Sequence, residues 1–137
     1  MTINLIKLAV GVESLEHLYS VQKRRLNKEG YISHLTRNHP KRYKELLNGG
    51  SIYWVIKGNI RGRQLINKIN KIQIEGKNKC EFLLTPEIII TEKKVKKPHQ
   101  GWRYLKMKDS PEDILNSDLE AGLPINMVIE LKNLGLW

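Results

Sequence analysis

The first part of the chain alternates between apolar runs and mixed segments, which predicts a strand followed by a helix. Residues 3–10 are mostly apolar and end before Gly11, as in a first strand. After Ser14, apolar side chains recur at helical spacing, with acids near the start and basic residues near the end. This pattern predicts an amphipathic helix over residues 13–27, capped by Ser14 and closed by Gly30.

A weak alternation of apolar and polar side chains over residues 31–37 predicts a short second strand. We expect Ile32 and Leu35 to face inward and His34 or Thr36 to face outward. This strand would connect the first helix to the basic segment that follows it in the chain.

The densest apolar stretch, residues 52–56, contains only β-branched and aromatic side chains. It predicts a strand buried on both faces, with Trp54 in the core rather than on the surface as a stacking platform. Before it, Pro40 suits the first position of a helix, and residues 40–47 predict about two helical turns. Two consecutive glycines then end that helix and lead into the central strand.

Residues 63–75 contain repeated isoleucines whose spacing fits neither a helix nor a strand throughout. Their isoleucine content and a turn signal at residues 76–78 favour a strand with a β-bulge where the period slips. A basic extension follows at residues 93–97. Further strand-like segments lie at residues 80–84, 88–91 and 102–105.

The C-terminal part of the chain predicts two more helices. Residues 110–113 combine a capping serine, a proline at the first helical position and an acid at the third. Residues 124–134 predict a last helix. Together the elements predict one α+β domain over residues 1–137, with a mostly antiparallel curled sheet or a small β-barrel flanked by helices.

Composition narrows the class of protein. The 137 residues are 40% hydrophobic, enough for one self-contained core. No run approaches the ~18–20 apolar residues of a membrane helix, and the start of the chain makes no convincing signal peptide. The single cysteine, Cys80, excludes an internal disulfide and a cysteine-based zinc site. We therefore expect a cytoplasmic protein with no membrane partner.

The charge of the chain favours an anionic partner. Its 24 Lys and Arg against 14 Asp and Glu give a formal net charge of +10, which favours polyanions such as nucleic acid. A competing explanation is AT-rich coding, which produces Lys, Ile and Asn together without any selection for binding. The arginines therefore weigh more than the lysines in the search for a site.

No catalytic, metal or phosphate-loop motif is present in the sequence. There is no nucleophilic triad or carboxylate pair, and none of the four histidines has a partner at helical zinc spacing. The glycines around residues 58–62 have neither the phosphate-loop ending nor the dinucleotide spacing. We therefore assign no catalytic residue, metal or cofactor.

Basic and aromatic side chains instead gather next to the predicted strands. Arginine pairs with phosphate through two N–H groups, and aromatic rings stack on unpaired bases for about 1–3 kcal/mol each. No helix resembles a base-reading helix, so the mixture favours single-stranded or looped RNA over a DNA groove. The candidate RNA-binding residues are Arg37, Lys41, Arg42, Lys57, Arg61, Arg63, Trp102, Arg103 and Tyr104.

Several of these residues have simpler explanations. Trp102 and Tyr104 alternate with Arg103, so either the two rings or the guanidinium faces outward. A plain solvated basic face would also account for the charges. Ion pairs across a hairpin are a further alternative, namely Arg61 or Arg63 with Glu75 or Glu81.

Several short motifs, spread over nearly the whole chain, together carry a resemblance to a known protein family. They are Leu5-Ile6-Lys7-Leu8, His34-Leu35-Thr36-Arg37, Pro40-Lys41-Arg42, residues 49–58, Arg63-Gln64 and Gln100-Gly101-Trp102-Arg103-Tyr104-Leu105. In this arrangement the chain resembles an uncharacterised bacterial family, the domain-of-unknown-function family 1489. That resemblance implies no particular activity, because the family carries none that can be transferred.

A second resemblance is one of fold only. A short helix that runs into a Gly-Gly turn and then a hydrophobic strand, residues 41–63, is similar to PUA and ASCH-like domains. This resemblance implies a small barrel that binds RNA or modified bases, or in a few cases a small hydrolase. The chain lacks the acid that ASCH-type domains often carry after that helix, so no catalytic role is transferred.

We therefore expect a non-enzymatic RNA-binding module whose partner is RNA or a ribonucleoprotein. A small hydrolase or base-modifying enzyme is an alternative that needs a pocket holding His34, His39 or His99. That histidine would need a carboxylate, such as Glu45 or Glu81, within hydrogen-bond reach. The third hypothesis is a protein-interaction module that uses the C-terminal helix and the terminal tryptophan.

Overall fold

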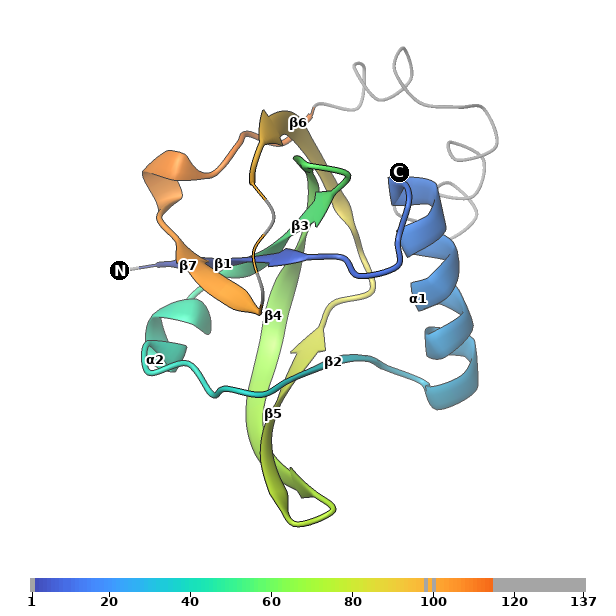
Figure 1. Cartoon of the computed structure of the whole chain (residues 1–137), viewed down its shortest axis with the longest axis vertical. Coiled ribbons are helices and arrows are strands. Elements are labelled where there is room, and N and C mark those ends of the chain that lie inside the picture. Colours follow the sequence, from blue (N-terminus) through green and yellow to red (C-terminus); the bar gives the residue numbers. More distant parts are fainter. Residues whose placement is uncertain (1, 98, 100, 115–137) are drawn as a thin grey trace.

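The computed structural model describes residues 2–97, 99 and 101–114 of the chain (Figure 1). Its elements are β1 (Asn4–Leu8), α1 (Leu15–Glu29), β2 (Ile32–Thr36), α2 (Tyr43–Leu46), β3 (Ser51–Ile56), β4 (Asn59–Ile74), β5 (Lys77–Leu84), β6 (Ile89–Val95), β7 (Trp102–Leu105) and the 3-10 helix η1 (Met107–Asp109). The helix predicted over residues 124–134 lies outside the described residues. Within them, no helix has both the length and the apolar character needed to cross a membrane.

The described strands form one open sheet. Their order is β2-β5-β4-β3-β1-β7, and β6 also pairs with β4. Every pair is antiparallel except β1 with β3, which run parallel. The predicted mostly antiparallel sheet is therefore confirmed. The predicted barrel is wrong, because β2 and β7 end the strand order without pairing with each other.

Strand β4 runs the length of the molecule and connects the two halves of the sheet (Figure 1). Its first part pairs with β3 and β6, and its second part pairs with β5. The register with β5 shifts between Ile66 and Lys68, which confirms the expected β-bulge. The strand begins earlier than predicted, at Asn59, because the residues before Arg63 also pair with β3.

Two tight turns at the opposite ends of β4 set its pairing. Lys57 and Gly58 join β3 to β4 with φ angles of 49° and 80°. Glu75 and Gly76 join β4 to β5 with φ angles of 52° and 78°. Two consecutive positive φ angles are typical of a type I′ turn, whose twist matches that of paired strands. The β3–β4 turn and the tip of the β4–β5 hairpin therefore lie far apart (Figure 1).

The main core lies between α1 and one face of the sheet. Leu18 of α1, Leu5, Trp54 and Phe82 are each at most 4% exposed within it. The prediction that Trp54 is a core residue is confirmed. A smaller apolar cluster occupies the opposite face and consists of Ile6, Tyr53, Val55, Ile60 and Leu105, with Leu8 packed against it. Strand β3 is therefore buried on both faces, as predicted.

The capping signals of the first helix are confirmed. The hydroxyl of Ser14 accepts the backbone N–H of His17 at 3.0 Å, and Gly30 ends α1 with a φ angle of 81°. The second helix is shorter than the predicted 40–47. Helix α2 begins only at Tyr43, and Pro40 lies in the loop before it.

Two other local predictions are wrong. Leu35 is 47% exposed and Thr36 is buried, because residues three apart in a strand lie on opposite faces. No helix forms from Ser110 to the end of the described residues at 114. There η1 ends at Asp109, and Asp113 forms an isolated β-bridge with Thr91.

Candidate nucleic-acid interface

The loop between β2 and α2, residues 37–42, is held against β7. Trp102 Nε1 donates to the carbonyl of Asn38 at 3.1 Å, and the backbone N–H of Arg42 donates to the Tyr104 hydroxyl at 3.1 Å. The Arg42 guanidinium lies 5.4 Å from the Tyr104 ring centroid. The two aromatic rings meet edge-on, with centroids 5.1 Å apart. This aromatic pair therefore fixes the position of the loop.

A groove of about 460 Å³ lies between this loop and the β4–β5 hairpin. Its lining, here called the basic groove, consists of Arg37, His39, Lys71, Ile72, Gln73, Asn78 and Lys79. Strand pairing explains how these residues meet. Thr36 of β2 pairs with Cys80 of β5, and Cys80 pairs with Lys71 of β4. The chain therefore leaves β2 beside the lysines of the hairpin.

The basic groove is positively charged without compensation. Arg37, Lys71 and Lys79 line it together, and no carboxylate is found among its described lining residues. None of these three cations forms an ion pair in the part of the chain that the structure describes. Arg37 and Lys71 are exposed, and Lys79 is half-buried. Such an arrangement attracts a polyanion.

An exposed aromatic ring stands at the edge of the basic groove. His39 packs edge-on against Tyr43, with ring centroids 5.4 Å apart, and Tyr43 is 38% exposed. The same loop carries the exposed side chain of Lys41, and Arg42, whose guanidinium pairs with Glu45. Part of the charge of Arg42 is therefore neutralised, whereas Lys41 adds to the positive field of the loop.

Four residues of this interface were missed by the sequence analysis: His39, Tyr43, Lys71 and Lys79. A signal existed for the lysines, because a turn after residue 74 places them on paired strands of one hairpin. No local signal marks His39 or Tyr43. Their place beside the groove depends on the contacts of the loop with β7, which is distant in sequence.

The remaining sequence candidates lie elsewhere. Lys57 is in the β3–β4 turn, at the end of β4 opposite the β4–β5 hairpin, and Arg61 follows close to that turn (Figure 1). Arg103 is exposed and lies on the face of β7 opposite Trp102 and Tyr104, which are half-buried. The expectation that the rings and the guanidinium point in opposite directions is confirmed.

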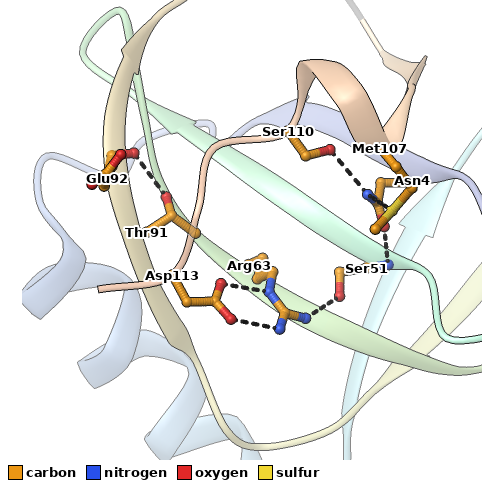
Figure 2. A network of polar contacts seen from close by, with 8 residues as sticks. All are labelled: Asn4, Ser51, Arg63, Thr91, Glu92, Met107, Ser110 and Asp113. Atoms are coloured by element: carbon orange, nitrogen blue, oxygen red, sulfur yellow. Dashed lines mark hydrogen bonds and ion pairs between the residues drawn. The ribbon is translucent and has the colours of Figure 1, made fainter. Parts of the chain in front are cut away.

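Arg63 is engaged within the protein (Figure 2). Its Nε and Nη2 donate to the two carboxylate oxygens of Asp113, both at 2.9 Å, and its Nη1 donates to the Ser51 hydroxyl at 2.8 Å. The hydrogen bonds to Asp113 raise the pKa of this guanidinium. The partners considered for Arg63 from the sequence, Glu75 and Glu81, are therefore wrong. Arg63 serves to hold the segment after β7 on the sheet.

The enzyme alternative depends on a histidine that lies in a pocket with a carboxylate within hydrogen-bond reach. His34 lies in a second pocket, of about 260 Å³, between α1, β1 and β2. Neither His34 nor His39 has a hydrogen-bonded carboxylate in the described residues. Those residues also contain no group of three or more His, Cys, Asp or Glu that could hold a metal ion.

Comparison with known proteins adds a family but no activity. No curated protein and no solved structure matched the chain, so the resemblance to PUA and ASCH-like domains is not confirmed. The described strands also do not form the barrel that this resemblance implies. A family model described as a protein of unknown function, DUF1489, matches residues 5–137. This match confirms the resemblance found in the sequence motifs, and the chain belongs to the DUF1489 family.

Proposed function

We propose that this protein binds single-stranded or looped RNA through the basic groove. One observation carries the proposal. Arg37, Lys71 and Lys79 line a single groove, and among the described residues that lining contains no acid and none of the three is paired. They come from the end of β2 and from β4 and β5, which are neighbours in the sheet at a strand spacing of about 4.8 Å. A strand of phosphates that crosses the sheet edge would meet one cation after another.

A base can stack next to these phosphate contacts. Tyr43 is exposed and packs on His39, which itself lines the groove. Stacking of one base on such a ring contributes about 1–3 kcal/mol. Trp102 and Tyr104 have a different role in this proposal, because their polar atoms bind the backbone of the loop. They position the loop, and Tyr43 replaces them as the stacking residue.

The shape of the protein favours single strands over a duplex. A DNA-reading helix must be free to enter the major groove. In the described residues, α1 packs its apolar side chains against the sheet, and α2 has only 4 residues. An RNA loop or single strand needs only a charged groove and a ring, which are both present here.

The test compares two variants that lose the same charge. The groove variant carries Arg37→Gln, Lys71→Gln and Lys79→Gln, and the control variant carries Lys57→Gln, Arg61→Gln and Arg103→Gln. Fluorescence anisotropy measures the affinity of each for a labelled 12-nucleotide RNA, the matched DNA and a hairpin RNA. We expect the groove variant to bind RNA at least tenfold more weakly and the control to stay within threefold of the wild type. Loss of three phosphate contacts should reduce the salt slope of log K by about 2.

Equal weakening of both variants would mean that only the net charge attracts RNA, and the proposal would be wrong. Absence of binding by the wild-type protein at low salt would also overturn it. Circular dichroism and a urea-unfolding midpoint check that each variant is folded. All six substituted side chains are exposed or half-buried, so we expect both proteins to fold.

A further inference from the structure

The second pocket combines apolar walls with two unpaired cations. It lies between α1, β1 and β2, has a volume of about 260 Å³ and is lined mostly by aliphatic side chains of these elements and the segment after β1. Lys7 of β1 and Arg25 of α1 also line it, and the described residues of its lining include no carboxylate. Neither cation forms an ion pair in the described part of the chain. Glu29 borders an adjoining depression together with Arg25 and His34.

His34 adds an unsatisfied polar atom to this pocket. Its Nε2 is buried and has no hydrogen-bond partner among the residues that the structure describes. The imidazole ring is held edge-on against Trp54, with centroids 5.2 Å apart, and Trp54 is the register partner of Lys7. Folded proteins rarely leave a buried polar atom without a partner, and such an exception calls for an explanation.

The electrostatics of these groups favour the binding of an anion in this pocket. Burial, followed by the charges of Lys7 and Arg25, lowers the pKa of His34 to about 4. Burial also lowers the pKa of Lys7. Each shift reflects positive charge that is held out of water without a negative partner. An anion in the pocket would oppose both shifts and accept a hydrogen bond from each group.

We propose that this pocket binds a small organic anion, with its carboxylate or phosphate group at Lys7, Arg25 and His34 Nε2 and its apolar body against the aliphatic wall. The volume is smaller than the 300–1,000 Å³ of ordinary ligand sites, so the ligand is small. The inference is independent of RNA binding, because none of these residues lines the basic groove.

The test uses four probes: hexanoate, hexyl phosphate, inorganic phosphate and neutral hexanol. Binding is followed by NMR, through the imidazole nitrogen shifts of His34 and the backbone shifts of α1 and β2. We expect saturable binding of hexanoate or hexyl phosphate and a rise of the His34 pKa by at least one unit in the complex. The tighter of these two probes identifies the head group, and inorganic phosphate alone should bind more weakly.

Matched variants separate this pocket from general surface charge. Arg25→Gln and Lys7→Gln should each weaken binding at least fivefold, whereas Arg24→Gln, on the same helix but outside the pocket, should change it less than twofold. Lys7 is half-buried, so a folded Arg25→Gln protein keeps the test valid if Lys7→Gln unfolds. Equal binding of hexanol would show an apolar cavity only and overturn the proposal. No binding of either hexyl anion, or binding unchanged in Arg25→Gln, would overturn it as well.

Discussion

Protonation of His34 should make the stability of this protein depend on pH below neutrality. The pKa of His34 falls from its ordinary 6.5 to about 4 in the folded protein. The causes are burial and then the charges of Lys7 on β1 and Arg25 on α1, and Glu29 lines a depression together with Arg25 and His34. Between these two pKa values the unfolded chain binds the proton first. The contribution of His34 to stability is therefore present above pH 6.5 and is lost as the pH falls through about 4.

The size of this loss follows from the two pKa values. Linkage gives a decrease in the free energy of unfolding of about 2 kcal/mol between pH 7 and pH 5, and of about 3 kcal/mol between pH 7 and pH 4. Urea unfolding of the wild type and of His34→Gln at pH 7 and pH 5 measures it, because the other titrating groups are common to both proteins. We expect the wild type to lose about 2 kcal/mol more than the variant over this interval.

An NMR titration of the imidazole provides the direct control. We expect a midpoint near 4 for His34 in the protein without ligand. A midpoint near 6.5, or equal loss of stability in the wild type and His34→Gln, would show that the imidazole is not held among uncompensated cations. The proposed anion pocket would then lose its electrostatic support.

Two further predictions concern the core and the turn before β3. Gln64 is fully buried, and Gln64→Met keeps the length of its side chain. The substitution leaves Trp54 Nε1 and the amide of Gln22 without their hydrogen-bond partners. The free energy of unfolding, measured by urea titration, should therefore fall by about 2–4 kcal/mol. Gly50→Ala should cost about 3 kcal/mol or more, because a Cβ there would collide with two backbone carbonyl oxygens. At Gly49 a Cβ has open space but φ is 86°, so Gly49→Ala should cost only about 1–2 kcal/mol. Equal costs of Gly49→Ala and Gly50→Ala would contradict this explanation.

Elements with strong local signals could be predicted from the sequence. Helix α1 follows from its cap residues and its apolar period, and β3 follows from an unbroken run of β-branched and aromatic side chains. Ser110 shows the limit of such signals. Its capping pattern is outweighed by tertiary contacts, because Asp113 pairs with Arg63 and forms a β-bridge with Thr91.

The candidate site depended on pairings that no local pattern specifies. Nothing in the chain indicates that β2 pairs with β5, and this pairing is what brings Arg37 to Lys71 and Lys79. The sequence lists Arg37 among the candidate RNA-binding cations, but it groups it with Arg63, which lies in an internal ion pair. The sequence shows which residues are cations. Which of them form internal ion pairs and which stay unpaired depends on the register of the sheet.

The affinities of the two proposed sites should depend differently on salt concentration. The cations of the basic groove are exposed or half-buried, and single-stranded RNA releases condensed counterions when it binds them. Three phosphate contacts therefore predict a loss of affinity of about 40-fold between 50 and 300 mM salt. A small organic anion carries no condensed counterions, and Lys7 is held partly out of water, where screening is weaker. Its affinity should therefore fall much less over the same range. A parallel fall of both affinities would mean that the second pocket acts only through the overall charge of the protein.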